Sequence, residues 1–112
     1  MVERIYRGDV FTICVSTSES GEVIGISARF RDNSVDIRFD EQRVSIQYGD
    51  IGISIFNIGG IISTPSLDEI ESRISIYGVD RIGYRIVDIA ENLLMFAQDR
   101  MLRSRHNIRF KI

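Results

Sequence analysis

The chemistry that this sequence could perform depends first on Cys14 and His106, because each is the single residue of its type among 112 residues. A cysteine or serine nucleophile needs a base, normally histidine, beside it in space and oriented by a third group. Cys14 lies in an alternating, strand-like segment, whereas His106 lies near the C-terminus. Nothing in the pattern brings the two together, so we predict no nucleophilic site and expect Cys14 to be a small buried or half-buried thiol.

Metal binding is also not predicted, because one cysteine and one histidine cannot supply the four ligands that zinc usually takes. Asp36 and Asp40 are the carboxylate alternative. Four positions apart on one face of a strand, they would lie roughly 13 Å from each other, with Arg38 between them. We therefore predict that Asp36 pairs with Arg29 and Asp40 with Arg43, and that these carboxylates hold no cation.

The glycines do not form a phosphate-binding loop. Residues 21–25 and the pair Gly59-Gly60 lack the glycine-rich fingerprint, and the single lysine, Lys111, follows neither of them. We therefore predict no cofactor. An enzyme is the less favoured class of protein, since its acidic residues would have to converge only in three dimensions.

Basic residues suggest one binding activity. Residues 100–111 contain five basic side chains and no acidic one, and four further arginines fall on the polar phase of the strands. Phosphate contacts dominate nucleic-acid affinity, so we keep nucleic-acid binding as the alternative function. The net charge of −2 and the core phase of the strand aromatics oppose it, because single strands bind on exposed aromatic rings. The tail residues are Arg100, Arg103, Arg105, Arg109 and Lys111. The arginines of the strands are Arg29, Arg31, Arg38 and Arg43.

The elements that position these side chains are indicated by the alternation of apolar and polar residues from 10 to 56. This period of two, interrupted by short polar turns, predicts an antiparallel β-meander of five strands. One face carries Phe, Ile, Val and Tyr side chains and suits a core, whereas the other is polar and suits water.

The register of the meander follows from the turns, since opposed residues of a hairpin must point to the same face. A loop at Glu19-Ser20 opposes Val15 to Ile24, although Thr17 to Gly21 could form a longer loop. A loop at Asp32-Asn33 opposes Phe30 to Val35, and Arg29 to Asp36 on the other face. Loops at Glu41-Gln42 and Gly49-Asp50 oppose Val35 to Tyr48 and Tyr48 to Ile51.

Two helices are predicted after the meander. Ser66 and Glu69 form a capping box before a helix that begins at Leu67, and Gly78 ends this helix after about eleven residues. Asp80 is expected to cap a longer helix that runs to about Arg103 and covers the apolar sheet face. Its apolar stripe of period near 3.6 contains Ile82, Ile86, Ile89, Ala90, Leu93, Ala97 and Met101.

Short strands are expected near both ends of the chain. Residues 107–112 alternate and should add to a sheet edge, and Val2 to Arg7 could be a further edge strand. The predicted fold is α+β, with a five-stranded antiparallel β-meander, two helices packed on one face and a short C-terminal edge strand (βββββααβ). We expect residues 1–112 to form one domain.

The favoured function comes from Leu94, Met95 and Phe96, where the apolar surface of the second helix widens beyond one stripe. Such a surface is typical of a partner-binding site, although the first helix or the glycine loop could also cover it. With no catalytic residues, we expect a small non-enzymatic protein-binding or adaptor protein that forms a homo-oligomer. No apolar run approaches the roughly 18 residues of a membrane helix, and the charged first residues do not suit a secretion signal. We therefore expect a cytoplasmic protein.

Overall fold

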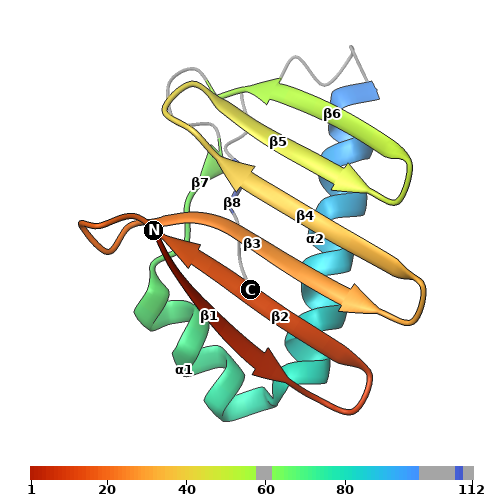
Figure 1. Ribbon diagram of the computed structural model, residues 1–112. Helices are drawn as coiled ribbons and strands as arrows, with labels where there is room; N and C mark the ends of the chain where they lie inside the picture. Colours follow the sequence, from red (N-terminus) through yellow and green to blue (C-terminus); the bar gives the residue numbers. More distant parts are fainter. Residues whose placement is uncertain (58–61, 99–107, 110–112) are drawn as a thin grey trace.

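A computed structural model describes residues 1–57, 62–98 and 108–109. The predicted α+β class and the antiparallel meander are confirmed, but the main sheet has six strands and not five. Its strands follow one another in sequence order, each antiparallel to the next (Figure 1). They are β1 (Val2–Arg7), β2 (Phe11–Thr17), β3 (Val23–Phe30), β4 (Asn33–Phe39), β5 (Arg43–Tyr48) and β6 (Ile51–Phe56).

The additional strand is β1, which forms one outer edge of the sheet. It pairs with β2 along its whole length, from Val2 opposite Thr17 to Arg7 opposite Thr12. The turn between the two strands is closed by a hydrogen bond of 2.8 Å from the Gly8 amide to the Phe11 carbonyl. β1 and β2 therefore form one hairpin, with Asp9 and Val10 in its turn.

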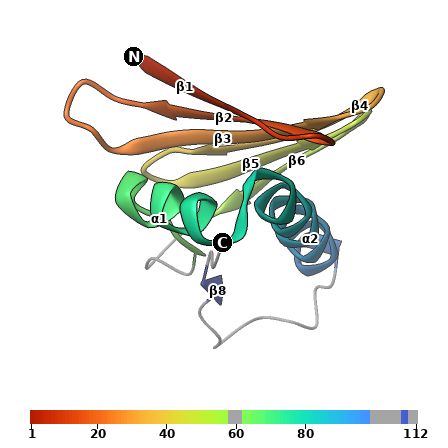
Figure 2. The same ribbon diagram turned by 90° about the horizontal axis from the view of Figure 1, so that it is seen from below.

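Two helices cover one face of this sheet and leave the other face open in the part of the chain that the structure describes (Figure 2). They are α1 (Leu67–Tyr77) and α2 (Val79–Gln98). The alternating apolar side chains of β2 to β5 meet the helix stripe in one core, as their period of two predicts. The largest fully buried side chains are Phe11, Ile13, Ile26, Ile37, Ile46, Ile62, Ile70, Ile86, Leu93, Val15, Val35 and Val44.

The register of two hairpins is as predicted, and that of the other two is wrong by two residues. Val35 opposes Tyr48 and Tyr48 opposes Ile51, in agreement with the turns at Glu41-Gln42 and Gly49-Asp50. Phe30, however, opposes Asn33 across β3 and β4, so the loop is Arg31-Asp32. Arg31 takes the left-handed backbone conformation there, with φ of 53°.

The hairpin of β2 and β3 also differs from the predicted register. Phe11 opposes Phe30 and not Ala28, and a bulge interrupts the ladder between Ser16 and Thr17. The loop spans residues 18–22 and is closed by a hydrogen bond of 2.8 Å from the Ser18 amide to the Glu22 carbonyl. Because a bulge shifts the facing of the chain by one residue, Val23 is buried and Ile24 turns toward the open face.

Helix α1 begins and ends as predicted. The Ser66 hydroxyl accepts a hydrogen bond of 3.1 Å from the Glu69 amide, and Gly78 ends the helix with φ of 88°, a conformation that favours glycine. Helix α2 begins at Val79, so the prediction that Asp80 is its cap is wrong. The predicted end near Arg103 and the stripe residue Met101 lie outside the described residues.

Asp80 instead joins the start of α2 to the turn between β1 and β2. Its Oδ1 atom accepts hydrogen bonds of 2.9 Å from the amides of Val10 and Phe11, and Oδ2 accepts one of 3.1 Å from Asp9. These three donors hold the pKa of the Asp80 carboxyl below its usual range, since hydrogen bonds to a carboxylate favour its charged form. The carboxylate thereby fixes where α2 meets the sheet.

Tyr6 makes the corresponding contact between β1 and α1. Its hydroxyl donates a hydrogen bond of 2.9 Å to Glu71 Oε2. Burial and this carboxylate raise the pKa of Tyr6 to about 12. Both helices are thus tied by polar contacts to the β1–β2 end of the sheet.

The C-terminal strand does not add to the main sheet in the described structure, contrary to our prediction. Residues Ile108–Arg109 form β8, which pairs in parallel with β7 (Ile62–Ser63) in a separate two-stranded sheet. β7 was not predicted, because its two residues are too few to show a period. None of the helices in the described ranges is long and apolar enough to cross a membrane.

Candidate functional site

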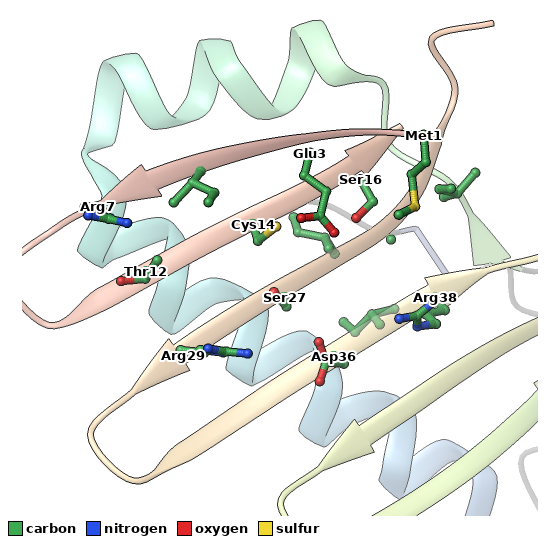
Figure 3. A pocket seen from close by; sticks show the side chains of 15 residues that line it. Met1, Glu3, Arg7, Thr12, Cys14, Ser16, Ser27, Arg29, Asp36 and Arg38 are labelled. Carbon is green, nitrogen blue, oxygen red and sulfur yellow. The ribbon is translucent and has the colours of Figure 1, made fainter. Parts of the chain in front are cut away.

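The open face of the sheet carries a polar groove over β1 to β4 (Figure 3). The register places Glu3, Ser16, Gly25 and Arg38 in one row across these strands. Small side chains at the centre of the sheet leave a cavity of about 450 Å³. Larger charged side chains rise at its margins, and Figure 3 shows them pointing over the strands. They are Glu3, Arg7, Arg29, Asp36 and Arg38.

Cys14 lies in this groove but is poorly suited to nucleophilic chemistry. Burial, with the Glu3 and Asp36 carboxylates, raises the pKa of the Cys14 thiol above its ordinary value, and Arg29 compensates only in part. The reactive form of cysteine is the thiolate, so the surroundings keep Cys14 protonated. Among the residues that the structure describes, no cluster of three His, Cys, Asp or Glu side chains could hold a metal ion.

The ion pairs predicted for this face are not formed by the expected neighbours. Because of the shift in register, Asp36 opposes Ser27, and Arg29 opposes Ser34. The prediction that Arg29 directly opposes Asp36 is therefore wrong.

At the next turn, Arg43 lies 4.7 Å from the centre of the Phe56 ring, in a cation–π contact. The Asp40 carboxylate accepts a hydrogen bond of 2.6 Å from the Glu41 amide. Arg43 and Asp40 thus make these contacts in place of the predicted ion pair with each other.

The groove continues over β4 to β6 as a second hollow of about 520 Å³. Its floor is again made of small or uncharged side chains, Ser45, Gln47, Gly52 and Ser54. The Ser45 and Ser54 hydroxyls lie 3.1 Å apart and share a hydrogen bond. This arrangement offers hydrogen bonds and guanidinium groups to a ligand.

The end of α2 was the predicted partner-binding surface, and its residues Leu94, Met95 and Phe96 differ in how exposed their side chains are. Leu94 is half-buried and packs against the core, and Phe96 is also half-buried. Met95 is 66% exposed. Helix α2 crosses the strands from β2 to β6 in turn, so these residues lie at the β6 end of the sheet (Figure 1).

Ala97 shows that this last turn of α2 lies at the edge of the sheet and not over its centre. It follows Leu93 by four residues on the stripe that faces the core, and Leu93 is 1% exposed. Ala97 is nevertheless exposed, contrary to its predicted place in the buried stripe. The core-facing side of the helix is thus uncovered here by the described part of the chain.

Strand β6, beside this turn, is a feature that the sequence analysis did not single out. It is an outer strand of the six-stranded sheet, and its six residues, IGISIF, carry no charge. Ile51 and Phe56 are both more than half exposed. Natural edge strands usually carry charges or proline that prevent pairing with another chain. The absence of a charged residue from Ile51 to Phe56 was the sequence feature that could have indicated an unprotected edge strand.

The other edge of the sheet provides the contrast. β1 carries Glu3, Arg4 and Arg7 within six residues, so one edge is protected by charge and the other is not.

The residues predicted to bind nucleic acid are largely beyond the described structure. Arg100, Arg103, Arg105 and Lys111 lie outside it, and for Arg109 only the backbone of β8 is described. Comparison of the chain with protein-family models, with curated proteins and with solved structures finds no match.

Proposed function

We propose that this chain is a non-enzymatic protein-binding protein that forms a homo-oligomer through the end of α2 and the edge of β6. We call this the α2–β6 surface; it consists of residues 94–97 and strand β6. The observation that carries the proposal is the exposed last turn of α2 beside an uncharged outer strand. Apolar side chains gathered at an unprotected strand edge favour association with another chain.

Met95 is the large apolar side chain that the last turn of α2 exposes most. Burying an exposed methionine fully contributes about 1.5–3 kcal/mol, and its flexible thioether adapts to many partner shapes. Ala97 and the exposed part of Ile51 would add apolar area on the helix-covered face of the sheet, and Phe56 would add apolar area on the open face. Backbone hydrogen bonds along β6 would determine the orientation of the partner strand and the specificity of the contact.

The test is the molar mass of the purified chain across a wide range of concentrations, by light scattering coupled to gel filtration. The proposal predicts a mass above the 12.8 kDa of one chain, and its loss in Met95→Arg. Ile76→Arg is the matched control, because Ile76 is 67% exposed on α1, away from β6. A chain that stays monomeric at the highest concentration, or equal effects of the two variants, would contradict the proposal.

Nucleic-acid binding is the second candidate, and the arginines of the open-face groove favour it. Arg29 and Arg38 are exposed on the same face, with Arg7 at the groove margin. Guanidinium groups of this kind could contact the phosphates of a single strand, and the basic residues 100–111 are a second, separate basic region. Affinity for a labelled oligonucleotide should then fall steeply between low and physiological salt.

Charge reversal separates the two basic regions in this test. Arg103→Glu with Arg105→Glu should abolish oligonucleotide binding if the tail carries it. Arg29→Glu with Arg38→Glu should do so if the groove carries it. Binding that is weak at low salt, or unaffected by both pairs of substitutions, would remove this candidate.

A further inference from the structure

The backbone hydrogen bonds of β6 determine which of its groups face outward. The Asn57 amide donates a hydrogen bond of 2.7 Å to the Gln42 carbonyl across β5 and β6. Hydrogen-bonded and non-hydrogen-bonded pairs alternate along an antiparallel ladder. Ile55, Ile53 and Ile51 therefore bond to β5, and the N–H and C=O groups of Gly52, Ser54 and Phe56 point to the free edge.

These outward groups can pair with a second β6 strand. In a two-fold symmetric antiparallel pair, the same residues meet from both chains, and opposed residues must lie on the same face. A pair centred on Ser54 opposes Ser54 to its own copy and Gly52 to Phe56. All three outward residues of each strand then exchange hydrogen bonds, about six in total.

The side chains tolerate this register. Gly52, Ser54 and Phe56 lie on the open face, so the centre of the pair has two small hydroxyl side chains and no charge. A register centred on Ile53 would instead oppose Asp50 of the turn to Phe56 and would place a charge in the pairing. The other edge of the sheet differs, because β1 carries Glu3, Arg4 and Arg7, and charged side chains are a usual means of keeping an edge strand from pairing.

The α2 helix adds a second, independent feature at the same edge. Its exposed last turn would lie above the paired strands, because Ala97 and Phe96 are at the β6 end of the helix face that packs on the sheet. A new strand hydrogen-bonded to β6 would run about 4.8 Å away, under this turn. The uncovered helix end and the free strand edge thus favour the same occupant.

We infer that the partner at the α2–β6 surface is a second copy of this chain, joined strand to strand through β6 with Ser54 at the two-fold axis. The inference rests on the proposed function and specifies its partner. The result is one continuous antiparallel sheet across two chains, with the two α2 ends meeting on its helix-covered face.

Disulfide trapping tests the register. Cys14→Ser removes the native thiol, and Ser54→Cys is then introduced. In the paired strands the two Cα atoms would be about 5.5 Å apart, within the range of a disulfide. Ser45→Cys in the same background is the matched control, since Ser45 is the same residue type, directly opposite on β5. Its two copies would be three strand spacings, roughly 14 Å, apart.

Mild oxidation should give a covalent dimer on a non-reducing gel for Ser54→Cys and little for Ser45→Cys. No dimer at position 54, or equal amounts at both positions, would overturn the inference. If the unmodified chain associates in the mass measurement but Ser54→Cys does not cross-link, the proposed function stands and only this partner geometry fails.

A charge exchange at position 54 tests the same geometry without oxidation. Ser54 is exposed, so Ser54→Arg and Ser54→Asp should leave the monomer folded, which circular dichroism checks. Each variant alone places like charges at the two-fold axis and should weaken self-association about tenfold or more. Mixing the two should restore association, because opposite charges then meet. Failure of the mixture to recover would also overturn the inference.

Discussion

Substitution of Gly83 by alanine tests how α2 is seated on the sheet. Gly83 is buried where α2 crosses β2. A Cβ atom at this position would lie 2.6 Å from both Cδ1 and Cδ2 of the Phe11 ring, and closer still to Cγ. The ring cannot easily move away, because Phe11 is 1% exposed and its centroid lies 5.0 Å from that of Phe30 and 4.8 Å from that of Tyr84.

Two opposing effects set the size of the change. Alanine is favoured over glycine inside a helix by about 1 kcal/mol. Overpacking a filled core costs about 1–3 kcal/mol, or more where the neighbour is rigid. Since the clash involves the root of an aromatic ring and not a flexible end, we expect the upper part of that range. Gly83→Ala should therefore lower the free energy of unfolding by roughly 1–2 kcal/mol.

Urea unfolding followed by circular dichroism measures this change. Ser75→Ala on α1 is the control for helix propensity, because Ser75 is exposed and the substitution should be neutral or slightly stabilising. Phe11→Leu should reduce the penalty of Gly83→Ala, since leucine lacks the ring that meets the new methyl group. A Gly83→Ala protein as stable as the original, or no coupling between the two positions, would refute this account of how α2 contacts β2.

Three further predictions concern titratable groups. Asp80→Ala should lower the free energy of unfolding at neutral pH. Because the pKa of Asp80 is lowered in the folded chain, its stabilisation is present above about pH 4, the usual Asp pKa, and is lost as the pH falls through the folded-state pKa. The free energies of unfolding of the original chain and the variant should therefore converge in acid. Tyr6 should ionise only near pH 12, as followed by tyrosinate absorbance, and Tyr6→Phe should remove this step. The stabilisation that the Tyr6 hydroxyl provides is complete below about pH 10 and is lost toward pH 12. Cys14 should react slowly with a thiol reagent at pH 8, and Glu3→Gln should speed the reaction because the Glu3 carboxylate raises the Cys14 pKa; an unchanged rate would contradict the placement of Glu3.

The sequence predicted which face each strand residue takes better than it predicted the register. The alternation gives the facing of a side chain, and a shift by two residues preserves that facing, so it cannot distinguish Phe30 opposite Val35 from Phe30 opposite Asn33. The turn decides, and here the turn uses Arg31 in a left-handed conformation that arginine rarely adopts. Where glycine stands in the loop, at Gly49-Asp50, the prediction was right.

The candidate site was only partly accessible from sequence. Helical spacing placed Leu94, Met95, Phe96 and Ala97 on the second helix, but whether Ala97 is covered depends on where the sheet ends, which is a property of the tertiary structure. Residues 2–7 were expected as a further edge strand outside the meander, and the structure pairs them with β2 along their whole length. The free edge of β6 follows from the strand order, since without that order the uncharged run Ile51–Phe56 cannot be distinguished from a central strand.

The most direct test of the central claim is amide hydrogen exchange along β6, measured residue by residue by NMR at low and high protein concentration. In a single chain the amides of Ile53 and Ile55 bond to β5, whereas those of Gly52, Ser54 and Phe56 face outward. If two chains associate through this edge, the three outward amides exchange rapidly in dilute solution and become protected at high concentration. Exchange that is equally fast, or equally slow, at both concentrations would contradict association through this edge.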